Sequence, residues 1–266
     1  MATSAAEHQV TAFDNDRMYQ AAEILLKARR EVMPIHELPE KLRPHSLEEA
    51  YALQDIVAEA IGMMGGWKVG APTPDATPVV SPMPLWGGFA KSGTRMAASF
   101  KRLRGVEAEV AFCLSKDLPL RAKRYAREEV ADAIGSAHPA IELLESAYFE
   151  IEKVDRLSLL GDMLCNGGFV YGAAVPDWQK LDLAAESVKV TVDGAVRFEG
   201  KSSNPGGTDL LRLVTWLANE GSYRTGGLKF GQWITTGTWS GVTYAKAGST
   251  AEVRFSRFGE VRVNFE

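Results

Sequence analysis

Residues Gly105–Leu114, GVEAEVAFCL, read as a buried β-strand with two acids inside it. A short run of Val, Ala, Phe and Cys is typical of a strand in the interior of a sheet. Successive side chains of a strand point to opposite faces, so Glu107 and Glu109 share one face, with their Cα atoms roughly 6.5 to 7 Å apart. Two like charges on a dry face repel each other, so they either have raised pKa values or share a cation.

Taken alone, this pair has a more ordinary explanation, which is an edge strand whose acids lie in water beside Arg102 or Arg104. A third acid favours the buried interpretation. Glu142 lies in the apolar run HPAIELLESAYF and shares its strand phase with Leu144. Three carboxylates that converge from two strands, without thiolates or paired histidines, suit a hard divalent ion such as Mg²⁺ or Mn²⁺.

A lysine between glycines is the next candidate site residue. Lys68 lies in GGWKVG, where glycines allow a close approach of the backbone to a ligand. The local sequence is compatible with two interpretations, a surface lysine that extends along apolar neighbours or a charge directed at an anionic substrate.

Composition excludes several classes of partner. The 266 residues carry 30 Lys and Arg against 34 Asp and Glu, a net charge of −4 that predicts neither nucleic-acid nor membrane-surface binding. Cys113 and Cys165 lack the spacing of a zinc site or a disulfide framework. We find no secretory leader pattern and no apolar run of about 18 residues. We therefore expect a cytoplasmic protein with a small neutral or anionic metabolite as its partner.

Hydrophobic periodicity predicts an α+β fold. We expect helices over residues 14–32, 46–64 and 127–135, and a fourth that starts with Asn204 as its cap and continues to residue 221. Strands are expected over residues 67–70, 106–114, 140–146, 169–175, 188–192, 196–199, 233–236, 251–256 and 261–265. The predicted organisation is a helical region over residues 1–64 followed by a β-rich catalytic domain over residues 65–266.

Several segments together resemble a known family. The stretches PIHELPEKLRPHSLEEAYALQ, GWKVG, VEAEVAF, PAIELLES, TWLANE and LKFGQWITTGTWSG occur in the order found in 2-keto-4-pentenoate hydratases. That family also includes 2-oxo-hept-4-ene-dioate hydratases and 4-oxalocrotonate decarboxylases, and it belongs to the fumarylacetoacetate hydrolase superfamily. The resemblance implies N-terminal helices followed by a mixed β-roll, and assembly into homo-oligomers.

The resemblance also implies roles for individual residues. It makes Glu107, Glu109 and Glu142 the ligands of Mg²⁺ or Mn²⁺, and it places Lys68 against the carboxylate or enolate oxygen of a 2-keto acid. The acid in GDMLCNGGFVYG that matches the family is Asp162, a candidate catalytic residue. The matching turn GTWSG contains Thr238, Trp239 and Ser240, which the resemblance implies as substrate-contacting residues. Glu145, His138 and Asp162 are candidate proton carriers because of their positions in the sequence, although a structural role for His138 is equally open.

The implied activity is that of a lyase. A hydratase of this family adds water to a 2-hydroxy-dienoate or 2-keto-enoate through a metal-bound enolate, as in aromatic-compound catabolism. Decarboxylation of a 2-oxo-dioate and carbon–carbon hydrolysis of an acylpyruvate are alternatives on the same scaffold. Hydrolysis needs a general base with an acid partner, and His36 and Glu37 supply these residue types, although we expect their segment to be a loop. A non-catalytic 2-keto-acid-binding protein is a further alternative, because PLWGGFAKSG lacks the acids that the hydratases commonly carry at this place.

Overall fold

The computed structural model describes residues 12–97, 102–201 and 203–266. The chain divides into two compact units. One unit is the described part of Met1–Ala60 together with Ser146–Cys165, and the other comprises Ile61–Glu145 and Asn166–Glu266. The segment 146–165 therefore belongs with the N-terminal helices, although it lies between two strands of the second unit in the sequence.

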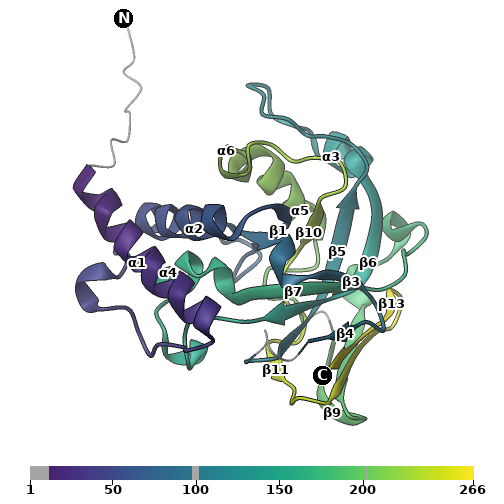
Figure 1. The fold of residues 1–266 in the computed structure, drawn as a ribbon. Helices are drawn as coiled ribbons and strands as arrows, with labels where there is room; N and C mark the ends of the chain where they lie inside the picture. Colours follow the sequence, from purple (N-terminus) through teal and green to yellow (C-terminus); the bar gives the residue numbers. More distant parts are fainter. Residues whose placement is uncertain (1–11, 98–101, 202) are drawn as a thin grey trace, which may run out of the picture. The chain divides into compact units, whose positions relative to one another are not determined.

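Amphipathic helices form the first unit. They are α1 (Ala12–Glu31), α2 (Leu47–Ile61) and the short α4 (Arg156–Gly161), so helices are present where residues 14–32 and 46–64 predicted them (Figure 1). Gln54 on the buried face of α2 donates a hydrogen bond of 2.8 Å to the carbonyl of Leu160. A Cβ atom at Gly161 would lie 2.5 Å from Leu53 Cδ2, so a larger residue here would have to displace the buried Leu53 side chain of α2.

A mixed eight-stranded sheet is the larger layer of the second unit. Its order is β2 (Val79–Pro84), β1 (Met64–Gly70), β10 (Trp233–Thr235), β5 (Gly105–Leu114), β6 (Ile134–Leu144), β7 (Asn166–Tyr171) and β3 (Phe89–Lys91), and β11 (Thr243–Tyr244) also pairs with β5. The pairs β1–β10 and β3–β7 are parallel, and the other pairs are antiparallel. Because β5 lies in the middle of this order, most of its residues are buried on both faces.

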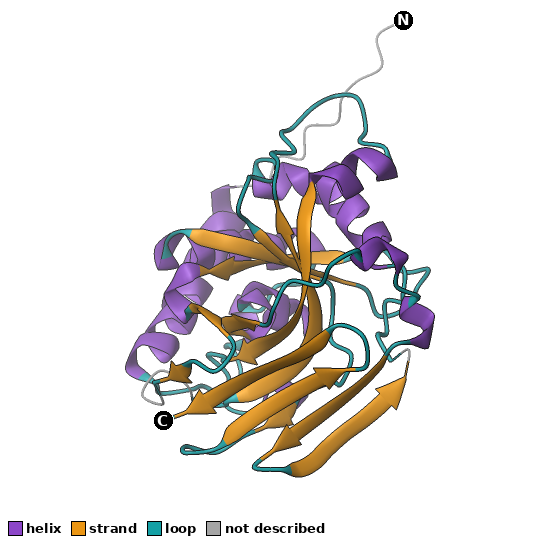
Figure 2. Cartoon of the chain, turned by 90° about the vertical axis from the view of Figure 1, so that its right-hand side faces the viewer, coloured by secondary structure: helices purple, strands orange, loops and turns teal. Residues whose placement is uncertain are grey.

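A second sheet packs against the first. Its order is β4 (Arg95–Met96), β13 (Gly259–Phe265), β12 (Thr250–Phe255), β8 (Ser187–Val192) and β9 (Ala195–Lys201). Figure 2 shows these strands side by side near the C-terminus. Strand β12 alternates buried and less buried residues, with Ala251, Val253 and Phe255 in the core, and both β12 and β13 contact β6 of the larger sheet.

The helices of the second unit are short. They are α3 (Arg127–Ala133) and α5 (Leu210–Trp216), which continues through the π-helical turn Leu217–Gly221 into α6 (Ser222–Thr225). The prediction that Asn204 caps the last helix is wrong. The helix begins at Leu210, and Asp209 caps it by accepting a hydrogen bond from the Arg212 N–H. No helix among the described residues has the length and apolar character that a membrane span needs.

The structure differs from the sequence expectations at several strands. β6 begins at Ile134 rather than at residue 140 and ends at Leu144, so Glu145 lies outside the strand. The edge strand β2 was not predicted, because Pro82 and Pro84 lower the strand propensity of this segment. Proline is tolerated there because an edge strand has one side without a sheet neighbour.

Candidate metal centre

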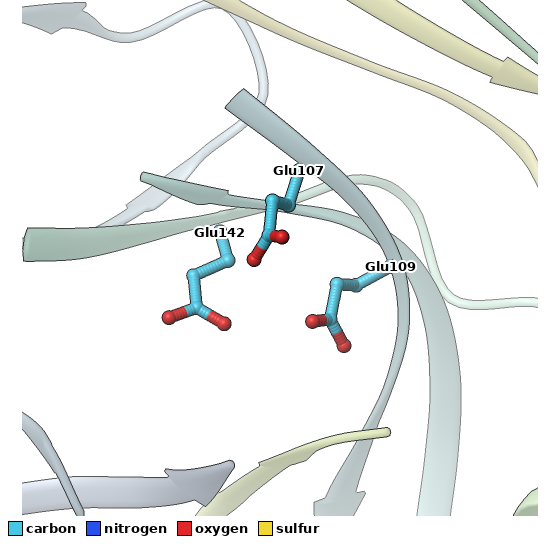
Figure 3. A group of neighbouring side chains, drawn as sticks. All are labelled: Glu107, Glu109 and Glu142. Carbon is cyan, nitrogen blue, oxygen red and sulfur yellow. The ribbon is translucent and has the colours of Figure 1, made fainter. Parts of the chain in front are cut away.

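Three glutamates from neighbouring strands meet on one face of the larger sheet. Glu107 of β5 lies directly opposite Glu142 of β6, and Glu109 is two residues further along the same face. One carboxylate oxygen from each residue lies within 4.8 Å of the others, and Figure 3 shows the three side chains turned into one space. In the part of the chain that the structure describes, this is the one group of three acidic, His or Cys side chains with such convergent atoms.

Hydrogen bonds hold two of these carboxylates. Glu109 Oε2 accepts hydrogen bonds from the backbone N–H groups of Thr236 and Gly237 at 2.9 and 2.7 Å. Glu142 Oε1 accepts a hydrogen bond from Asn166 Nδ2 at 2.9 Å and lies 2.7 Å from Lys68 Nζ. Glu142 Oε2 is buried and has no hydrogen-bond partner among the described residues.

This arrangement fits a divalent cation. A buried carboxylate oxygen without a donor is costly, and a bound cation would remove that cost. The converging donors are all carboxylate oxygens, which is the ligand type that Mg²⁺ and Mn²⁺ prefer. Three carboxylates and one ammonium leave two formal negative charges in the site.

Burial and charge displace the pKa values of the site residues. Burial disfavours the charged form of Lys68, but the fields of Glu142, Glu107 and Glu109 outweigh this effect and raise the pKa of the lysine above its ordinary value. Burial raises the pKa of Glu107 to about 7, against the opposing effect of Lys68. Burial, Glu142 and Glu107 together raise the pKa of Glu109 well above its ordinary value. Glu107 and Glu109 therefore resist ionisation unless a positive charge lies beside them.

A turn after β10 supports Glu109. Asn204, which is 5% exposed, donates hydrogen bonds from Nδ2 to the carbonyls of Thr236 and Gly237, both at 3.0 Å. Gly237 has a φ of 93°, which favours glycine, and its N–H points at the Glu109 carboxylate. Asn204 therefore fixes the peptides that orient Glu109. Sequence reasoning missed this role, because an Asn before Pro-Gly reads equally well as a helix cap.

The predicted substrate-contacting residues of this turn mostly contact the protein itself. Ser240 Oγ accepts a hydrogen bond from the Ala108 N–H at 3.1 Å and donates one to the Gly241 carbonyl at 2.7 Å. The Trp239 side chain is 1% exposed, and its ring packs edge-on against Phe255 at 5.7 Å between centroids. These contacts favour structural roles for Trp239 and Ser240. The substrate contact of Thr238 stays a prediction. Its Oγ1 makes two long hydrogen bonds, accepting one from the Ser240 N–H at 3.3 Å and donating one to the Gly241 carbonyl at 3.4 Å.

Asp162 is the centre of a buried network in the first unit. Its Oδ1 accepts a hydrogen bond from Arg29 Nε at 2.6 Å, and its Oδ2 accepts hydrogen bonds from Ser146 Oγ at 2.6 Å and the Ala147 N–H at 2.9 Å. After it, Met163, Leu164 and Cys165 all have left-handed backbones, with φ values of 55°, 48° and 62°. These contacts support an anchoring role, and a catalytic role for Asp162 stays a prediction.

The other two candidate proton carriers are also engaged by the protein. Glu145 is buried, and its Oε2 accepts hydrogen bonds from the backbone N–H groups of Arg102 and Leu103. His138 lies on the same strand face as Glu142, but Nδ1 is 2.9 Å from the Gly172 carbonyl and Nε2 is 2.8 Å from Ser136 Oγ. Both nitrogens therefore have partners, which favours a structural role for this histidine.

Comparison with known proteins agrees with this fold. The chain is 26% identical over 264 residues to a 2-keto-4-pentenoate hydratase of Paraburkholderia xenovorans (strain LB400) and to 2-keto-4-pentenoate hydratase 3 of Pseudomonas putida, with 93% of this chain and 94% of each relative covered. Among solved structures, it resembles the 4-oxalocrotonate decarboxylase from Pseudomonas putida G7 complexed with magnesium and adipate, with a TM-score of 0.79, 22% identity and coverage of 98% and 100%.

A more distant solved structure is a fumarylpyruvate hydrolase from Pseudomonas aeruginosa in complex with Mn²⁺ and pyruvate, with a TM-score of 0.55, 14% identity and coverage of 75% of this chain and 88% of that one. These likenesses confirm the predicted α+β fold with its mixed sheets. The family model described as fumarylacetoacetate (FAA) hydrolase C-terminal matches residues 71–266. The chain belongs to the fumarylacetoacetate hydrolase family.

Proposed function

We propose that this chain is a metal-dependent hydratase that adds water to a 2-hydroxy-dienoate or 2-keto-enoate, with Glu107, Glu109 and Glu142 as the ligands of Mg²⁺ or Mn²⁺. The observation that carries the proposal is the unpartnered Oε2 of Glu142 beside two further carboxylates. The hydration reaction is supported by the two curated relatives, which are named as hydratases.

The residues around the carboxylates suit a small acid with an unsaturated carbon chain. When bound, the divalent ion supplies a Lewis acid that polarises the oxygens of a chelating 2-keto acid. Lys68, held by Glu142, contributes a positive charge for the substrate carboxylate. The apolar residues Met83, Ala111, Ala140 and Phe169 pack together with Phe89, Tyr171 and Trp233. Since Ala111 and Ala140 share a sheet face with Glu109 and Glu142, this cluster forms an apolar wall beside the carboxylates.

Among the competing reactions, hydrolysis of an acylpyruvate has less support from the contacts. The His36 ring packs against Phe149 at 5.5 Å, and the Glu37 carboxylate pairs with Arg43 at 2.5 Å. The base and the acid that hydrolysis of an acylpyruvate would use are thus engaged with different partners. We keep decarboxylation of a 2-oxo-dioate and simple 2-keto-acid binding as alternatives for the experiment to separate.

A substrate panel tests the proposal. The purified protein with Mg²⁺ or Mn²⁺ is offered 2-hydroxypenta-2,4-dienoate, 4-oxalocrotonate and an acylpyruvate, while dienol absorbance and CO₂ release are followed. We expect loss of the dienol without CO₂ release, and formation of the hydrated keto acid. Release of CO₂ from 4-oxalocrotonate alone would identify a decarboxylase, and turnover of none of the three would leave a binding protein.

We further propose that the protein acts in the cytoplasm and assembles into homo-oligomers. The resemblance to the hydratases supports both statements. Size-exclusion chromatography with light scattering measures the assembly directly, and we expect a mass that is a multiple of the 29.0 kDa chain.

A further inference from the structure

Ser81 on strand β2 is a buried polar residue that the metal centre does not use. Its side chain is 0% exposed, and Oγ has no hydrogen-bond partner among the described residues. The strand register places Ser81 directly opposite Lys68 of β1, and Lys68 lies opposite Thr235 of β10. Residues opposite each other in neighbouring strands share a face of the sheet, so Ser81 and Lys68 point to the same side.

The face that Ser81 shares also carries the carboxylates. Thr235 lies opposite Ala111, and Ala111 is two residues along β5 from Glu109. Lys68 reaches across this face to Glu142 at 2.7 Å. The hydroxyl of Ser81 is therefore beside the lysine that we propose for substrate binding, on the edge-strand side of it.

An unpartnered hydroxyl at such a place has a physical cost. A buried hydroxyl that gives up its bond to water without finding another partner destabilises the folded protein. Alanine would fit in the same space without that cost. Among the described residues, no protein group thus competes with a ligand for this hydroxyl.

We infer that Ser81 is a substrate-contacting residue, whose hydroxyl donates a hydrogen bond to a carboxylate oxygen of the 2-keto acid beside Lys68. The inference rests on the proposed function. The Ser81 hydroxyl adds a neutral donor next to the charged Lys68 ammonium. The two donors together make the site selective for ligands with a carboxylate at this position. Lys68 and Ser81 together can then bind both lone pairs that a carboxylate oxygen presents.

The test compares Ser81→Ala with the unchanged protein in two measurements. Calorimetric titration with oxalate in excess Mg²⁺ should show about tenfold to a hundredfold weaker binding by the variant, which corresponds to the loss of one hydrogen bond to a charged group. The melting temperature of the metal-free variant should be equal or higher, because the unpartnered hydroxyl is gone. The Mg²⁺-dependent rise in melting temperature should be unchanged, because Ser81 is not one of the three ligands.

A second ligand and a matched variant sharpen the test. Acetohydroxamate chelates metals through two oxygens but has a methyl group in place of a carboxylate, so Ser81→Ala should leave its affinity unchanged. Ser222→Ala removes another buried hydroxyl, one that donates to the Asn219 carbonyl at 3.0 Å. That control should lower the melting temperature and leave oxalate binding as it is.

The outcomes separate this inference from the proposed function. If the unchanged protein binds oxalate in a Mg²⁺-dependent manner and Ser81→Ala binds it equally well, the inference is overturned and the proposed function stands. Equal losses for oxalate and acetohydroxamate, or a lower melting temperature of the metal-free variant, also overturn it, because Ser81 would then support the structure of the site. If the unchanged protein binds neither ligand with Mg²⁺, both proposals fail together.

Discussion

Lys68 Nζ lies 2.7 Å from one carboxylate oxygen of Glu142, while the other oxygen of that carboxylate is buried without a hydrogen-bond partner among the described residues. The lysine side chain is 12% exposed and the glutamate side chain 0%. The ammonium therefore compensates part of the negative charge in the site and leaves an oxygen that suits a cation.

Replacing Lys68 with Met separates substrate binding from metal binding. Because the substitution leaves a buried carboxylate unpaired, we expect the metal-free protein to lose about 3–5 kcal/mol of unfolding free energy. The Mg²⁺-dependent rise in melting temperature should be larger than in the unchanged protein, since the ion then supplies the missing positive charge. Oxalate affinity should fall. Lys189→Met, which breaks the exposed pair with Glu199, is the control and should cost less than about 1 kcal/mol. Unchanged oxalate affinity in Lys68→Met would contradict its substrate role.

Asn204 supports a proposed metal ligand through the backbone. We expect Asn204→Ala to destabilise the protein by about 1–3 kcal/mol, because the buried carbonyl of Thr236 and the partly buried carbonyl of Gly237 lose a donor. The variant should also bind Mg²⁺ more weakly, because the N–H groups that orient Glu109 become less fixed. Calorimetric Mg²⁺ titration and thermal denaturation measure the two effects.

The chain offers a close control for this variant. Asn219 also donates to two backbone carbonyls, those of Tyr125 and Thr215, and accepts from one backbone N–H, that of Tyr125. Asn219→Ala should lose stability as well, but its Mg²⁺ affinity should not change. If both variants bind Mg²⁺ like the unchanged protein, the turn does not position Glu109.

The buried pair of Arg29 and Asp162 allows a test of the anchoring role. We expect Asp162→Asn and Arg29→Met each to lower the unfolding free energy by about 3–5 kcal/mol, because each leaves the other charge without its partner. The double variant should lose much less than the sum of the two, which denaturant titration can measure. Should Asp162→Asn instead keep its full stability and lose only turnover, Asp162 would be a catalytic residue.

His138 predicts a pH dependence of stability. Burial lowers its pKa below the ordinary 6.5, and its bond to the Gly172 carbonyl only partly opposes this effect. The unfolded chain then binds a proton at a higher pH than the folded chain does. The contribution of His138 to stability is complete above pH 6.5 and is lost as pH falls below that value towards the folded pKa. His138→Asn should therefore reduce the loss of unfolding free energy between about pH 7 and pH 5. Identical pH profiles for His138→Asn and the unchanged protein would contradict the assignment.

The acids of the site were predictable because strand phase is a strong constraint. Glu107 and Glu109 are two residues apart in one apolar run, so they lie on the same face of that strand. Glu142 lies in a second apolar run, and pairing the two runs as neighbouring strands can place all three acids on one face of the sheet. The structure confirms that they share a face, with Glu107 directly opposite Glu142.

Residues whose roles depend on partners far away in the sequence were not predictable. Ser81 lies in a segment with two prolines that does not read as a strand, and its position opposite Lys68 follows only from the register of β1 and β2. Asn204 reads as a helix cap, because Asn is favoured both at helix starts and in turns. The left-handed backbone of Met163–Cys165 has no sequence signal at all, since none of these residues is Gly, Asn or Asp.

Titration of metal-stripped protein with Mg²⁺ and with Mn²⁺ in a calorimeter tests the central claim most directly, with Glu109→Gln and Glu142→Gln as the site variants and the exposed Glu23→Gln as the control. We predict one ion bound per chain for the unchanged protein and for Glu23→Gln, and loss of that binding in both site variants. Binding of one ion per chain with unchanged affinity in Glu109→Gln and Glu142→Gln would contradict the assignment of these three glutamates as a metal centre.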